Sequence, residues 1–99
     1  MQQLLVLNIA PSLEEDLVDL LLSLDAVGGF TSYPVRGHGR TTTHTMSLTE
    51  QVTGRRKRVQ FELLLDEKAV PGLLEALAES VGRDVYWWTQ PILASGHLN

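Results

Sequence analysis

The order in which strand and helix patterns alternate constrains the fold of this chain more than any other feature. Residues 3–9 are apolar at nearly every position, as in a central strand that is covered on both faces. Leucines recur at helical spacing over residues 12–25, and a second amphipathic pattern precedes Gly82. In chain order, the sequence predicts a strand at 3–9, a helix at 12–25, strands at 30–37 and 57–65, a helix from about 69 to 81, and a strand at 85–90.

Two β-α-β halves with right-handed crossovers give a four-stranded antiparallel sheet with two helices on one face. The predicted fold class is therefore α+β, a ferredoxin-like βαββαβ sandwich, in a single domain over residues 1–99. Pro34 cannot donate a ladder hydrogen bond, so the second strand is expected at an edge. A chain of 99 residues buries only about 60–65% of its unfolded surface, which favours oligomerisation.

Local signals predict where the helices begin and end. Ser12 and Glu15 have the spacing of a capping box at the start of the first helix. Asp66 is expected to cap the second helix, and Gly82 is expected to end it in a left-handed conformation. The tail at 94–99 is expected to be loose.

A long loop, at about 37–57, separates the second and third strands and follows no periodic pattern. Loops of this length within a compact domain are usually functional or disordered. Only Glu50 opposes the basic residues of this region, although the whole chain has a net charge of −4. The sequence therefore predicts a local positive field near the ends of the loop. The alternative is a solvated hairpin whose charges only keep the edge strand soluble. Six of the eight basic residues fall here: Arg36, Arg40, Arg55, Arg56, Lys57 and Arg58.

The stretch Val35-Arg36-Gly37-His38-Gly39-Arg40 resembles the start of the T-loop in the PII signalling family. In that family a Val-x-Gly-x-Gly-Arg stretch opens a flexible loop after the second strand. The closest resemblance is to a PII-like branch encoded beside heavy-metal efflux pumps. The resemblance implies a homotrimer whose sheets face inward. It also implies three clefts at the loop bases that bind nucleotide, and loops that contact a transporter, enzyme or regulator.

By residue, the resemblance assigns phosphate contact to Gly37, Gly39 and Arg40. Arg83 stands where ordinary PII proteins carry a Gly- and Lys-rich loop, and it is either a remnant of phosphate binding or a surface charge. The full set of predicted effector-binding residues is Gly37, Gly39, Arg40, Arg55, Arg56, Arg58 and Arg83.

A metal site in the same loop is the alternative. His38, His44 and Met46 together offer imidazole and thioether ligands that suit copper, and imidazole alone suits zinc. The histidines lie six residues apart and not at helical spacing, so solvated histidines are the simpler interpretation. The alternative function is a small trimeric metal-binding protein of heavy-metal tolerance.

The last strand carries Tyr86, Trp87 and Trp88, so Trp87 must point away from the other two. One side of this strand is expected in the core of the chain. The other is expected to pack against a neighbouring subunit. A Tyr-Trp-Trp segment also occurs in the trimeric CutA family.

Several function classes are not expected. No nucleophile–base arrangement, phosphate-binding loop motif or metal-hydrolase helix motif is present, so we expect no enzyme. The first strand carries no aromatic residue for stacking bases, which argues against nucleic acid. No apolar run is long enough to span a membrane, and no signal peptide is apparent, so a cytoplasmic location is expected. The predicted function is a PII-like sensor that binds a small anionic effector at the base of its loop.

Overall fold

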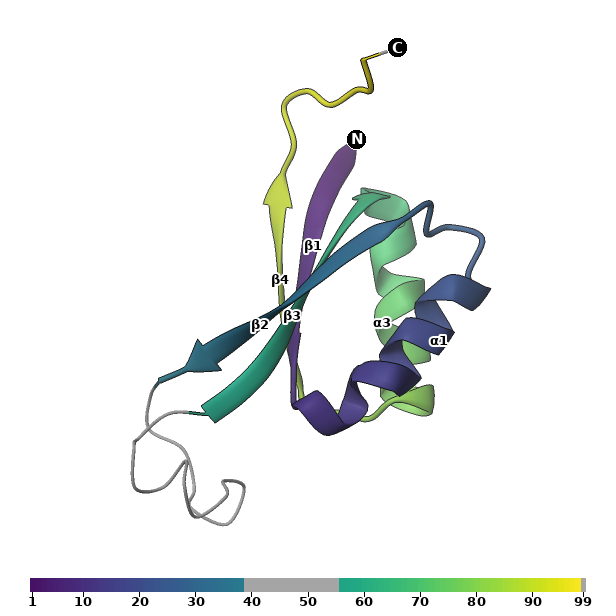
Figure 1. The fold of residues 1–99 in the computed structure, drawn as a ribbon. Helices are drawn as coiled ribbons and strands as arrows, with labels where there is room; N and C mark the ends of the chain where they lie inside the picture. The colour runs from purple at the N-terminus through teal and green to yellow at the C-terminus, as the bar shows by residue number, and fades with distance from the viewer. Residues whose placement is uncertain (39–55, 99) are drawn as a thin grey trace.

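An antiparallel four-stranded sheet forms the frame of the molecule (Figure 1). The computed structural model describes residues 1–38 and 56–98. The strands are β1 (Gln2–Ile9), β2 (Phe30–Gly37), β3 (Arg56–Asp66) and β4 (Val85–Pro91). Their order in the sheet is β2-β3-β1-β4, so β1 and β3 are central and β2 and β4 are the edges. This topology confirms the α+β, ferredoxin-like prediction.

Two helices cover one face of the sheet, α1 (Glu14–Ser23) and α3 (Val70–Ser80) (Figure 1). A short 3-10 helix precedes each of them, η1 (Pro11–Leu13) before α1 and η3 (Glu67–Ala69) before α3. Within the described residues, no helix has the length and apolar character needed to cross a membrane.

The sequence predicted the ends of the helices only in part. The predicted capping box is wrong, because Ser12 lies inside η1 and neither η1 nor α1 has a side-chain cap. Asp66 does cap the following turn, since its carboxylate accepts a hydrogen bond from the backbone N–H of Lys68 at 2.9 Å. Gly82 has a φ of +135°, and its N–H donates to the carbonyl of Leu77 at 3.0 Å. This conformation is strained for any residue with a side chain.

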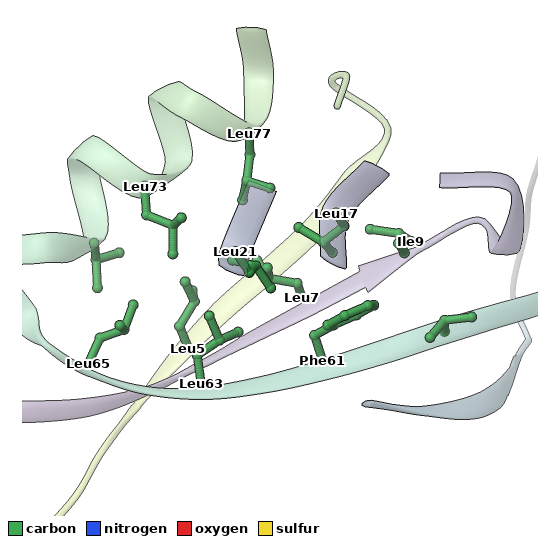
Figure 2. Packing of buried hydrophobic residues seen from close by; sticks show 12 residues of the cluster. Leu5, Leu7, Ile9, Leu17, Leu21, Phe61, Leu63, Leu65, Leu73 and Leu77 are labelled. Atoms are coloured by element: carbon green, nitrogen blue, oxygen red, sulfur yellow. The ribbon is translucent and has the colours of Figure 1, made fainter. Parts of the chain in front are cut away.

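The core lies between the sheet and the two helices (Figure 2). Alternate residues of β1 and β3 point towards the helices, and the ring of Phe61 packs beside that of Phe30, with centroids 5.8 Å apart. Helix α1 contributes Leu17 and Leu21 to this layer, both fully buried. The buried apolar cluster consists of Leu5, Leu7, Ile9, Leu17, Leu21, Val59, Phe61, Leu63, Leu65, Val70, Leu73 and Leu77.

The edge strands differ in character. Pro34 lies in β2, at an edge, as its missing N–H predicted. At the other edge, Tyr86, Trp87 and Trp88 are exposed to 56%, 51% and 41%. Trp87 pairs with Leu7 and so lies on the helix side, while the other two lie on the open face. Val85, on the same side of β4, packs against the core, whereas Trp87 is half exposed, so the expectation that this side lies in the core is confirmed only in part.

Candidate functional site

The two ends of the long loop lie side by side in the sheet. Strands β2 and β3 are paired up to their last described residues, with Gly37 opposite Arg56 and Arg36 opposite Lys57. Paired strands lie about 4.8 Å apart, so the basic side chains at the two ends share one end of the sheet. We call these four residues, Arg36, Gly37, Arg56 and Lys57, the loop base.

The basic residues of the hairpin are divided between its two faces. Residues that lie opposite each other in an antiparallel pair point to the same face. Arg36 and Lys57 therefore share the helix side, and Arg56 lies on the open face beside Gly37. Within residues 1–38 and 56–98, Arg36 and Arg56 form no ion pair with the chain's own carboxylates. Arg36 is exposed, and Arg56 is half-buried.

Arg58 is tied into the sheet instead. Its side chain is 3% exposed, although it lies on the open face. Its Nε donates to Oδ1 of Asn8 at 2.7 Å, and its Nη2 donates to the carbonyl of Asn8 at 2.9 Å. The guanidinium lies 5.3 Å from the ring centroid of Tyr86 and 3.9 Å from the carboxylate of Asp84. Arg58 thus links β3 to β1 and to the start of β4, which sequence reasoning did not foresee.

A chain of hydrogen bonds continues from Arg58 across the open face. Asn8 Nδ2 donates to Oε1 of Gln60 at 3.1 Å, and Gln60 Nε2 donates to the hydroxyl of Tyr33 at 3.1 Å. Tyr33 in turn donates to Oε2 of Glu62 at 2.8 Å, and this bond raises the pKa of Tyr33. Arginine can only donate and a carboxylate can only accept, so the two ends fix the direction of every bond between them. Such chains polarise their members and strengthen one another.

Arg83 lies at the other edge of the sheet. It is exposed in the turn between α3 and β4, and it lines an open cleft of about 630 Å³ with Gly82, Trp87 and side chains of α3. Glu75 and Glu79 line the same cleft, so its charge is mixed. Two strands, β3 and β1, separate this edge from β2. A single copy therefore does not bring Arg83 to the loop base.

Most of the remaining predicted residues lie in the part of the chain that the structure does not describe. Gly39, Arg40, Arg55, His44 and Met46 lie outside the described residues. His38 is exposed and follows directly after β2. In the described part of the chain, no group of three or more His, Asp or Glu residues is arranged to hold a metal ion. The metal alternative thus depends on residues that the structure does not describe.

Sequence reasoning missed the polar residues of the open face. Strand alternation does place Arg58, Gln60 and Glu62 on one side of β3. Nothing in the sequence showed that Asn8 and Tyr33 would face them, because this depends on the register between strands. A polar Asn8 within an otherwise apolar strand was the one local signal.

Comparisons with known proteins place the chain in a family. No protein of curated function matches it. A solved structure matches it along nearly its whole length, the crystal structure of a DUF3240 family protein from Shewanella baltica OS155 at 2.40 Å resolution. The two share 28% sequence identity with a TM-score of 0.81, over 99% of this chain and 97% of that one. The family model described as "Protein of unknown function (DUF3240)" matches residues 1–99, so the chain belongs to the DUF3240 family.

Proposed function

We propose that this chain is a PII-like regulatory protein that binds a small anionic effector at the loop base. A nucleotide is one candidate effector. Binding neutralises positive charge at the loop base and selects one arrangement of the loop, which then contacts or releases a membrane transporter or another protein. The role is non-catalytic and cytoplasmic, and the absence of cysteine is compatible with a reducing compartment.

The pairing of the loop ends is the observation that carries the proposal. It places Arg36 and Lys57 on one face and Arg56 on the other face of the same end of the sheet, on a protein whose net charge is −4. A cationic cluster on an acidic protein attracts small anions selectively to one place. Guanidinium groups also bind phosphate oxygens in a bidentate manner. Arg58 has a different role in this proposal, since its bonds to Asn8 hold the loop base in place.

The proposal includes a homotrimer, because in a single copy Arg83, one of the predicted effector-binding residues, lies at the edge of the sheet away from the loop base. Arg83 lies beside β4, and the loop base lies at the β2 edge. If β4 of one copy adjoins β2 of the next, Arg83 reaches the neighbour's loop base. Both strands are free edges of the described sheet. Strand β4 also lacks the charges that usually protect an exposed edge. Three such contacts around an axis close a ring.

Titration with anions tests the proposal. ATP, ADP, AMP and inorganic phosphate are added separately at low salt, and binding is followed by calorimetry and by the shift in melting temperature. We expect Arg36→Gln and Arg56→Gln each to weaken the binding of the preferred anion at least tenfold. The matched control is Lys68→Gln, which removes a basic residue at the opposite end of the sheet and should leave binding unchanged.

Two results would contradict the proposal. Binding that is equally weak in all three variants would show only a general charge effect. A melting temperature raised by copper or zinc, but by none of the four anions, would support the metal-binding alternative. Sedimentation velocity of the same samples measures whether the chain forms a trimer.

A further inference from the structure

The tail after β4 exposes apolar side chains that nothing in the described part of the chain covers. Residues 92–98 leave the sheet beside the N-terminus of β1 (Figure 1). The N–H of Ile92 donates to the carbonyl of Gln2 at 3.3 Å, and Ser95 Oγ donates to Oε1 of Gln2 at 2.6 Å. These bonds direct the start of the tail, yet Leu93 and Leu98 are each 100% exposed. The tail is thus partly held in place while its leucines remain in water.

A small apolar cavity of about 250 Å³ lies at the same end of the sheet. Leu65, on its floor, pairs with Gln3, and Gln3 also pairs with Pro91 at the end of β4. The cavity and the start of the tail are therefore level with each other along the strands. Most of the lining is aliphatic, with Asp25 and Lys68 among the polar residues: Leu24, Asp25, Ala26, Val27, Leu65, Lys68, Ala69, Gly72 and Leu73.

The sheet order separates this cavity from the tail of the same copy. Residues 24–27 line the cavity and lead into β2, whereas the tail follows β4. Leu65 of β3 also lines the cavity, and β1 lies between β3 and β4, so a tail would have to cross β1 to reach its own cavity. Between two copies the geometry is different. Suppose that β2 of a neighbouring copy lies beside β4 and runs antiparallel to it. Residues 24–27 of the neighbour, which precede its β2, then lie next to the start of the tail.

We propose that the tail of one copy docks on a second copy, with Leu93 and Leu98 covering the apolar cavity beside residues 24–27. This inference rests on the trimer of the proposed function. It explains why a tail that is anchored through Gln2 leaves two leucines exposed in a single copy. Burying these leucines removes apolar surface from water, which favours association. The trimer would therefore be held together at the end opposite the loop base.

Cysteine cross-linking tests this contact, since the natural chain contains no cysteine. One protein carries Ala26→Cys and another carries Leu98→Cys, and the two are mixed, allowed to exchange subunits and oxidised. We expect a disulfide between position 26 of one copy and position 98 of another, identified by peptide mass mapping. The matched control protein carries Asp19→Cys in place of Ala26→Cys. Asp19 is an exposed residue of α1, and the control should give no specific disulfide with position 98.

A second variant keeps the test independent of the cysteines. Leu93→Ser combined with Leu98→Ser should raise the dissociation constant of the trimer at least tenfold. The folded copy itself should be unaffected, because both side chains are exposed within it.

The outcomes separate this inference from the proposed function. A trimer that gives no 26–98 disulfide, or an unchanged dissociation constant in the double variant, overturns the docking of the tail and leaves the trimer standing. When both substitutions are placed in one copy, a disulfide that forms within that copy also overturns it. A chain that sediments as a monomer overturns the trimer and the docked tail together, whereas anion binding is judged separately by titration.

Discussion

Replacing Asn8 by alanine removes the main acceptor of the buried Arg58 guanidinium. In the native chain Asn8 Oδ1 accepts from Nε at 2.7 Å, and Asn8 Nδ2 donates to Gln60 at 3.1 Å. The backbone carbonyl of residue 8 still accepts from Nη2 in the variant, so one of the two bonds to Arg58 survives. Asn8→Ala therefore leaves a 3% exposed cation with part of its hydrogen bonding lost.

The size of the effect follows from these contacts. A hydrogen bond to a charged group contributes about 1.5–3 kcal/mol, and a neutral one about 1 kcal/mol. The ion pair with Asp84 cannot compensate, since it spans 3.9 Å and Asp84 is 58% exposed. We expect Asn8→Ala to lower the free energy of unfolding by roughly 2–4 kcal/mol. In a domain of this size, that lowers the melting temperature by roughly 8–25 °C.

Urea denaturation at one fixed protein concentration measures this change and keeps any oligomerisation constant. A double-mutant cycle with Arg58→Met isolates the interaction itself, because methionine keeps the apolar stem without the charge. We expect a coupling of about 1.5–2 kcal/mol between the two positions. A cost below about 0.5 kcal/mol for Asn8→Ala, or additive effects in the cycle, would refute the idea that Asn8 holds Arg58.

Three further predictions concern single positions. The hydrogen bond to Glu62 raises the pKa of the Tyr33 hydroxyl. The stability that this bond contributes is therefore complete below about pH 10 and is lost as the pH rises through the pKa of Tyr33 in the folded state. Tyr33→Phe should flatten the alkaline limb of the free energy of unfolding measured from about pH 9 to 11. The hydrogen bond from the backbone N–H of Lys68 lowers the pKa of the Asp66 carboxyl. The stability that this bond contributes is therefore present above about pH 4 and is lost as the pH falls through the pKa of Asp66 in the folded state. Asp66→Asn, which keeps an acceptor, should flatten the acid limb of the free energy of unfolding plotted against pH. Gly82→Ala should cost about 1–3 kcal/mol in urea denaturation because of the φ of +135°, whereas Gly72→Ala, in open space within α3, should be neutral or stabilising.

The order and type of the elements could be predicted because each depended on a local pattern. The strand at residues 30–37 has the predicted bounds, and Pro34 placed it at an edge for a purely local reason, a missing N–H. The start of α1 could not be predicted as well. Pro11 favours a tight first turn, and η1 takes up Ser12 before it can act as a cap. The exposure of Trp87 could not be predicted, because it depends on how far α3 extends over β4.

The candidate site was less predictable than the fold, because charge alone does not tell which arginines face solvent. Arg56 and Arg58 are two residues apart on one strand and belong to the same predicted cluster. The structure leaves Arg56 on the loop base and buries Arg58 against Asn8 and Tyr86. The difference comes from the distance to β1, whose ladder with β3 ends at Val59: Arg58 is the next residue and reaches back to Asn8, whereas Arg56 lies two residues further towards the loop. Beyond Val59, β2 and β3 continue as a two-stranded ribbon.

This ribbon allows one segment to hold the fold and, in the proposed function, to meet an anionic effector. Arg58 lies one residue past the end of the ladder with β1, close enough for its side chain to extend back over Asn8 towards Tyr86 and Asp84 of the β4 edge. Arg56 lies further along the two-stranded ribbon, opposite Gly37 on the loop base. Arg58 therefore connects the loop base to the edge that carries Arg83.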